Sequence, residues 1–392
     1  MTQQYAERAT TAAPRSARNA DLRDLVTMLE DHRERKLDVV MSASALSFRD
    51  GNVQVEGIER QITAGGVTTV DGTYRPTAVA DEHVAEKLNI PVSYLRRMRA
   101  ENVPLLDENV NAWLRKDPSR RFMLRALRGD SAPGAAPAEG VARALMSDSY
   151  KVMDNLDILF AALEGVQEAG HPTDVTGCDL TDRRMYVRVE SKAVEVMAPE
   201  LLSGYRSPFD GRSGNELPVV SAGFVITNSE VGSGAWSVTP RVVMQVCTNG
   251  LTLPMDVMRA VHVGAKHGEG VVSWSQETQK KELAVITSKT ADAVRTFLSR
   301  DYVEAKLREI QAAAGKPVAE PTKTIEHVTS ALKVNKETRD TILAHFVRGG
   351  QMTAGGVMQA VTSTAQTLAD ADQAAALEAL ALPALTAAAA HG

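Results

Sequence analysis

The sequence contains few of the residues that build disulfide frameworks, metal centres or membrane spans. Its 392 residues include two cysteines, Cys178 and Cys247, which are too few for a disulfide framework or a thiolate-rich zinc site. No uninterrupted apolar run reaches the roughly 18 residues that cross a bilayer, and residues 1–18 lack the apolar core of a signal peptide. We therefore expect a cytoplasmic protein with no membrane partner.

An excess of positive charge is also missing. The chain has 44 Lys and Arg against 49 Asp and Glu, which gives a formal net charge of −5. No global positive field therefore attracts nucleic acid, and any contact with it must come from a local patch.

Common catalytic motifs do not occur either. No Gly-Lys-Ser/Thr follows Gly65 and Gly66 to complete a phosphate-binding loop, and there is no nucleophile elbow. His262 and His267 are five residues apart with a glycine between them, which fits no common zinc-ligand spacing. We predict no catalytic residue, no metal and no cofactor.

The pattern that is present is a long alternation of apolar and polar residues between Val219 and Pro254. It predicts a β-hairpin with one apolar and one mostly polar face. Pro240 lacks an amide hydrogen, so the second arm should be at an edge or bulged there. Met185 to Val196 alternates in the same way and should pair with this hairpin. The expected fold is α+β, with a curved antiparallel sheet that has a central long hairpin, is packed by helices and is followed by a helical C-terminal region.

The expected organisation follows changes in composition along the chain. Proline, glycine and alanine dominate residues 129–140, which indicates a loop insertion. Amphipathic helical periodicity begins at Gln276. We predict a disordered tail at 1–19, an α+β core domain at 20–275, a helical region at 276–382 and a frayed tail at 383–392.

The segment from Asn109 to Arg128 is the most basic in the chain. It contains one acid, Asp117, with two interleaved aromatics, Trp113 and Phe122, and six cations: Arg115, Lys116, Arg120, Arg121, Arg125 and Arg128. Cations for phosphates and aromatics for stacking on bases are typical of a single-strand binding surface. The alternative is a charged helix end followed by an exposed strand, because arginine clusters also pair with acids inside oligomer interfaces.

Several stretches together resemble a family of bacteriophage- and plasmid-encoded proteins, domain-of-unknown-function family 932. They are LNIPVSYLRRM (88–98), NVNAWL (109–114), RFMLRAL (121–127), RALMSDSYKVMDNLDIL (143–159), RRMYVRV (183–189) and FVITNSEVGSGAWSVTPRVVMQVCTNGL (224–251). The resemblance covers roughly residues 79–277 and implies an accessory of mobile-element DNA metabolism. It transfers no catalytic motif. Met153 stands where the family more often has proline.

These observations lead to one main functional hypothesis, a protein that binds single-stranded DNA. In its general plan it would resemble annealing proteins that assemble as homo-oligomeric rings in the host cytoplasm. The predicted contact residues are Arg115, Lys116, Arg120, Arg121, Arg125, Arg188 and Arg241, with Trp113 and Tyr186 as stacking partners.

Two other classes of function remain open. One is a non-enzymatic interaction protein that binds a host factor or a component of the phage particle. The other is an enzyme of unrecognised type, for which Cys247 with His262, or Asp148 with Asp154, supply candidate groups.

Overall fold

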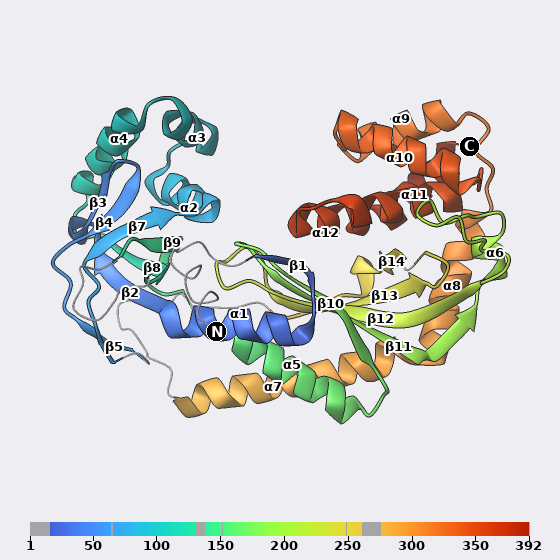
Figure 1. The fold of residues 1–392 in the computed structure, drawn as a ribbon, viewed down its shortest axis with the longest axis horizontal. Coiled ribbons are helices and arrows are strands. Elements are labelled where there is room, and N and C mark those ends of the chain that lie inside the picture. The colour runs from blue at the N-terminus through green and yellow to red at the C-terminus, as the bar shows by residue number, and fades with distance from the viewer. Residues whose placement is uncertain are drawn as a thin grey trace, which may run out of the picture.

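The computed structural model describes residues 16–63, 66–129, 138–150, 152–247, 249–260 and 276–391. The fold is α+β, as the sequence predicted, with two curled sheets and a helical C-terminal region (Figure 1). The two sheets replace the single curved sheet expected for residues 20–275. This division matters because the predicted DNA-contacting residues are distributed over both sheets.

A six-stranded sheet lies in the N-terminal lobe. Its strand order is β2-β8-β9-β7-β4-β3, and β7 pairs with β9 in parallel while its other pairs are antiparallel. The strands are β2 (Lys36–Ser42), β3 (Leu46–Arg49), β4 (Asn52–Val55), β7 (Gly72–Pro76), β8 (Arg121–Leu127) and β9 (Gly140–Ser147). Three helices pack on one face and share its core: α2 (Ala78–Leu88), α3 (Val92–Glu101) and α4 (Val103–Lys116). A separate ribbon consists of β5 (Gln61–Thr63) and β6 (Gly66–Thr68).

A seven-stranded antiparallel sheet forms the second lobe. Its order is β1-β10-β11-β12-β13-β14, with β15 also pairing with β13. The strands are β1 (Ala17–Ala20), β10 (Asp174–Leu180), β11 (Met185–Met197), β12 (Val219–Asn228), β13 (Trp236–Met244), β14 (Asn249–Thr252) and β15 (Met258–Ala260). The predicted hairpin is β12 and β13, and β11 pairs with β12 as expected. Below this sheet in Figure 1 lie α1 (Leu22–Arg35), α5 (Asn155–Ala169) and α7 (Gln276–Phe297).

Pro240 causes no bulge, since the register between β12 and β13 is continuous from Val220↔Met244 to Thr227↔Ser237. Its carbonyl accepts a hydrogen bond from the amide of Leu253. The N–H and C=O of one strand residue point to the same side, so the missing amide hydrogen falls on the side away from β12. There β14 and β15 pair with the residues on either side of Pro240, and the β12–β13 ladder is not interrupted.

The C-terminal helices are α8 (Arg300–Ala314), α9 (Pro321–Ala331), α10 (Lys336–Gly349), α11 (Ala354–Thr367), α12 (Ala371–Ala379) and α13 (Ala381–His391), and the short α6 (Pro199–Leu202) precedes β12. In Figure 1, α8 runs past one end of the seven-stranded sheet, and α9, α10, α11 and α12 lie on the side opposite α5 and α7. Residues 354–365 of α11 are all buried. By length and mean hydropathy, Ala371–His391 is the one described stretch that could cross a membrane. Its buried residues include Leu377, Ala381 and Leu385, which belong to the main core.

Both predicted tails need correction. Residues 383–391 are helical, and Ala384, Leu385 and Ala388 are buried. Pro383 is tolerated because it lies in the first turn of α13, where its missing amide hydrogen costs no helical hydrogen bond. At the other end, β1 pairs with β10, so the N-terminal tail does not extend to residue 19. Residues 1–15 and 130–137 of the predicted tail and loop insertion lie outside the described residues.

Candidate nucleic-acid interface

The nine predicted contact residues occupy three separate places. Five are exposed at the end of α4 and the start of β8: Trp113, Arg115, Lys116, Arg120 and Arg121. Arg125 is buried between the two sheets, and three residues lie on the polar face of the seven-stranded sheet: Tyr186, Arg188 and Arg241. The nine residues therefore do not form one binding surface, because they belong to different parts of the fold and one is inaccessible.

We call the five exposed residues the α4–β8 surface. The side chain of Trp113 is 42% exposed, and the Lys116 ammonium lies 4.7 Å from its ring centroid. Arg120 lies 4.9 Å from the ring centroid of Phe122 and donates a hydrogen bond to the carbonyl of Lys87. Within the described part of the chain, no ion pair engages Arg115, Lys116 or Arg121. This surface therefore keeps unneutralised cations beside an accessible aromatic ring.

Local structure explains why these cations are exposed. Arg115 and Lys116 are in the last turn of α4, where positive charge interacts favourably with the helix dipole. On β8, Phe122 and Leu124 face the core of the N-terminal lobe, which directs Arg121 to the opposite face. Arg121 is the first residue of β8, so it stays at the edge of the interface between the lobes.

Arg125 lies four residues further along the same face and is only 1% exposed. Its guanidinium donates to both carboxylate oxygens of Asp38, to Asp154 at 2.8 Å and to the carbonyl of Glu230 at 2.6 Å. These contacts occupy all three of its nitrogens. Arg125 cannot reach a phosphate in this fold, and its assignment as a contact residue is wrong.

Arg125 belongs to a buried polar cluster that we call the interlobe network. Its members are Asp38, Arg125, Arg143, Asp154, Asn155, Asn228 and Glu230. Arg143 donates to Glu230 at 2.7 Å, and the amide of Asn155 donates to the other carboxylate oxygen at 2.6 Å. Burial alone would raise the pKa of Glu230, but Arg143 and Arg125 outweigh it and lower this pKa to about 2.

No pattern in the sequence indicates this network. Its strands and loops come from both sheets, and Arg125 is 105 residues from Glu230. One available indication was that six of the seven residues, all except Asp38, lie in the stretches that carry the family resemblance. Those stretches meet here, at the junction of the lobes. The network connects the lobes and engages all three nitrogens of the buried Arg125 guanidinium.

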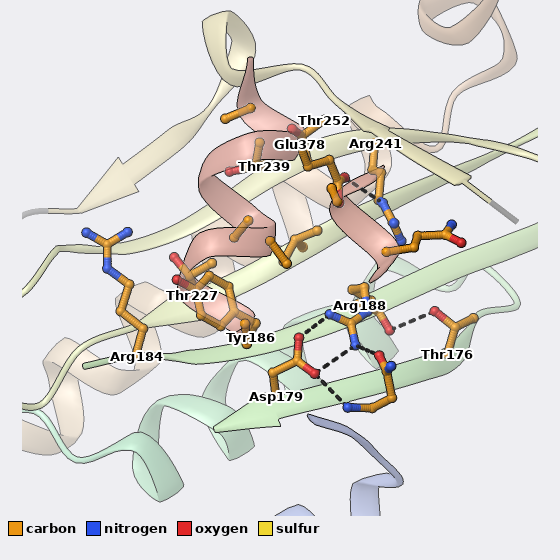
Figure 2. Close-up of a pocket in the computed structure, with 18 of the residues that line it drawn as sticks. Thr176, Asp179, Arg184, Tyr186, Arg188, Thr227, Thr239, Arg241, Thr252 and Glu378 are labelled. Carbon is orange, nitrogen blue, oxygen red and sulfur yellow. Dashed lines mark hydrogen bonds and ion pairs between the residues drawn. The ribbon is translucent and has the colours of Figure 1, made fainter. Parts of the chain in front are cut away.

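The remaining three predicted residues line a cavity of about 610 Å³ between the seven-stranded sheet and α12, which we call the sheet cavity. Each has a partner within the protein. Tyr186 donates to Asp372 at 2.7 Å, and Arg241 donates to Glu378 at 3.0 Å. Figure 2 shows Arg188 held by Asp179, and Arg188 also donates to the side chain of Asn19.

The sheet cavity is polar on the sheet side. The polar wall includes Thr227, Thr239 and Thr252 (Figure 2). Burial and the hydrogen bond to Asp372 both raise the pKa of Tyr186. Although burial opposes it, the contact with Arg188 lowers the pKa of Asp179. At neutral pH, Tyr186 is therefore a neutral donor and the Arg188–Asp179 pair is ionised.

Two of the groups considered for an enzyme, Cys247 and Asp154, are placed by the structure. Cys247 is 3% exposed, and Asp154 is bound by Arg125 and Lys36 in the interlobe network. His262 and His267 lie outside the described residues. No cluster of three or more His, Cys, Asp or Glu suited to a metal occurs in the ranges that the structure describes.

Comparison with known proteins adds no functional assignment. No family model, curated protein or solved structure matches this chain.

Proposed function

We propose that this protein is a phage- or plasmid-encoded accessory of DNA metabolism that binds single-stranded DNA through the α4–β8 surface. The observation that carries the proposal is the exposed ring of Trp113 beside cations with no carboxylate partner in the described structure. Arginine and lysine bind phosphates, and an exposed ring stacks on a base regardless of sequence.

The net charge of −5 makes the proposal specific to this surface. The net field of the protein does not attract a polyanion, so local cations must supply the electrostatic free energy of binding. For single strands, the slope of log affinity against log salt is about −0.7 per neutralised phosphate. Three contacts, from Arg115, Lys116 and Arg121, would thus contribute a slope of about −2.

Annealing by a homo-oligomeric assembly is the more detailed part of this proposal. It is supported by the resemblance across residues 79–277 and by the plan of a curled antiparallel sheet backed by helices. A fold alone does not determine function, so the DNA-binding surface carries the main argument. Sizing chromatography with light scattering tests this part, and a monomer at all concentrations would contradict it.

The central experiment is an anisotropy titration of labelled single-stranded DNA at several salt concentrations. The test variants are Trp113→Ala and the triple R115Q/K116Q/R121Q. The matched control, K280Q/K281Q/K289Q, removes three exposed cations from α7. We expect the test triple to weaken binding at least about tenfold and to reduce the salt slope by about 2.

Trp113→Ala should weaken binding by about 1–3 kcal/mol with little change in the salt slope, because it removes stacking but no charge. The control triple should bind like the wild type. Failure of the wild-type protein to bind, or equal losses in the two triples, would contradict the proposal.

A further inference from the structure

The polar face of the seven-stranded sheet is covered by a helix that is poorly suited to fill it. α12 lies across this face and contributes four alanines to the wall of the sheet cavity: Ala371, Ala374, Ala375 and Ala379. Methyl groups are too small to fill the space above Thr227 and Thr239, and a cavity of about 610 Å³ remains. At about 30 Å³ per molecule, it has room for roughly 20 waters.

The opposite face of the same sheet shows what close packing looks like in this protein. There Phe224 and Trp236 are fully buried in the main core. The sheet cavity is partly open to solvent, so α12 leaves part of the polar face unfilled. The contrast indicates that α12 gains little from apolar contact with the sheet, although Leu377 anchors it in the core on its other side.

Two acidic side chains of α12 supply its polar attachments to the sheet. Asp372 accepts a hydrogen bond from Tyr186, and Glu378 forms an ion pair with Arg241. Another cation on the cavity wall, Arg184, donates to the carbonyl of Ser233. The two carboxylates thus bind a hydroxyl and a guanidinium that would otherwise be available to phosphate oxygens.

We propose that the polar sheet face is a second binding site for the backbone of single-stranded DNA, and that α12 covers it with Asp372 and Glu378 in place of two phosphates. This inference rests on the proposed function. Leu368, in an extended conformation, separates α11 from α12, so the backbone changes direction at the start of α12. When α12 moves away, Tyr186 and Arg241 lose their α12 partners and face the strand.

Neutralising Asp372 and Glu378 in the full-length protein tests whether α12 competes with DNA for the sheet face. In D372N/E378Q the side chains keep their size but lose the charge that competes with phosphate. We expect affinity for single-stranded DNA to rise about tenfold and the salt slope to steepen. The control E326Q/E337Q removes two exposed acids from α9 and α10 and changes net charge equally. The triple variant R241Q/D372N/E378Q should lose this increase in affinity for single-stranded DNA.

Hydrogen exchange of the wild-type protein provides a second test that needs no variant. Saturation with single-stranded DNA should reduce protection of the α12 amides and leave those of α11 protected. Unchanged protection of the α12 amides, or the same affinity for DNA in D372N/E378Q and its control, would contradict the proposal that α12 covers a DNA-binding face.

The two proposals fail in different ways. If the wild-type protein binds through the α4–β8 surface and the α12 variants have no effect, only the proposal that α12 covers a second site is wrong. If only D372N/E378Q binds, and R241Q abolishes that binding, the sheet site stands and the α4–β8 proposal is wrong. If no variant binds, both are wrong.

Discussion

The guanidinium of Arg125 on β8 lies 2.8 Å from the carboxylate of Asp154 at the N-terminus of α5. The same guanidinium binds Asp38 on β2 and the carbonyl of Glu230 in the β12–β13 loop. A single side chain thus connects the six-stranded sheet to the central hairpin of the other sheet. Its charge is balanced within the protein.

Replacing Arg125 with Met should destabilise the fold by about 3–5 kcal/mol, because the Glu230 carbonyl and the partly buried Asp38 and Asp154 would lose the guanidinium, which leaves Lys36 as the remaining cation beside the two carboxylates. Arg121→Gln is the matched control on the same strand. Arg121 is exposed, so its replacement should change the free energy of unfolding by less than about 0.5 kcal/mol. Urea unfolding measures both. Equal stabilities would show that the network does not stabilise the fold.

A second prediction concerns His32, which is 5% exposed and has no hydrogen-bond partner for either ring nitrogen in the described structure. Burial, followed by the charge of Arg143, lowers its pKa from 6.5 to about 4. Between these values the unfolded chain binds a proton that the folded protein does not. The free energy of unfolding should therefore fall by about 3 kcal/mol as pH drops from 6.5 to 4.

The variant His32→Leu removes this titration and should flatten the stability profile between pH 6.5 and 4. His327→Gln, at an exposed histidine on α9, should keep the wild-type slope. Denaturant unfolding at a series of pH values distinguishes them. An unchanged slope in His32→Leu would assign the acid sensitivity to other groups.

A third prediction tests the close approach of α5 and α7. A Cβ on Gly165 would lie 2.3 Å from the carbonyl oxygen of Thr287 and 2.7 Å from the Cβ of Thr290. Gly165→Ala should force the helices apart and destabilise the protein by about 1–3 kcal/mol. At Gly315 a Cβ meets nothing within 4 Å, so Gly315→Ala should be neutral or stabilising by up to about 1 kcal/mol. Thermal unfolding compares them, and a stable Gly165→Ala would contradict the close packing.

The central hairpin was predictable because alternation is a local property of the sequence. Val220, Ala222 and Phe224 point to one face whatever the strand pairs with, and the structure buries all three. The division into two sheets was not predictable in this way. It depends on pairings such as that of β7 with β9, which are parallel and distant in sequence.

The different exposure of Arg121 and Arg125 shows why sites are harder to predict than strands. Arg121 and Arg125 are four residues apart on one face of β8, and the sequence gives them similar surroundings. Their exposure differs because Asp38, Asp154 and Glu230 surround only Arg125. No local pattern brings those three residues together. The exposed cluster around Trp113 was identifiable, since its residues are neighbours in the sequence.

The last prediction concerns the C-terminus, where the alanine-rich composition indicated a frayed tail. In α13, Leu385 is 3% exposed and belongs to the main core. Leu385→Ala should therefore cost about 2–5 kcal/mol of stability, as truncation of a buried leucine does. Thr386→Ala, one residue later on the exposed side, should cost less than about 0.5 kcal/mol. Urea unfolding compares the two variants, and a Leu385→Ala protein as stable as Thr386→Ala would mean that this helix does not pack in solution.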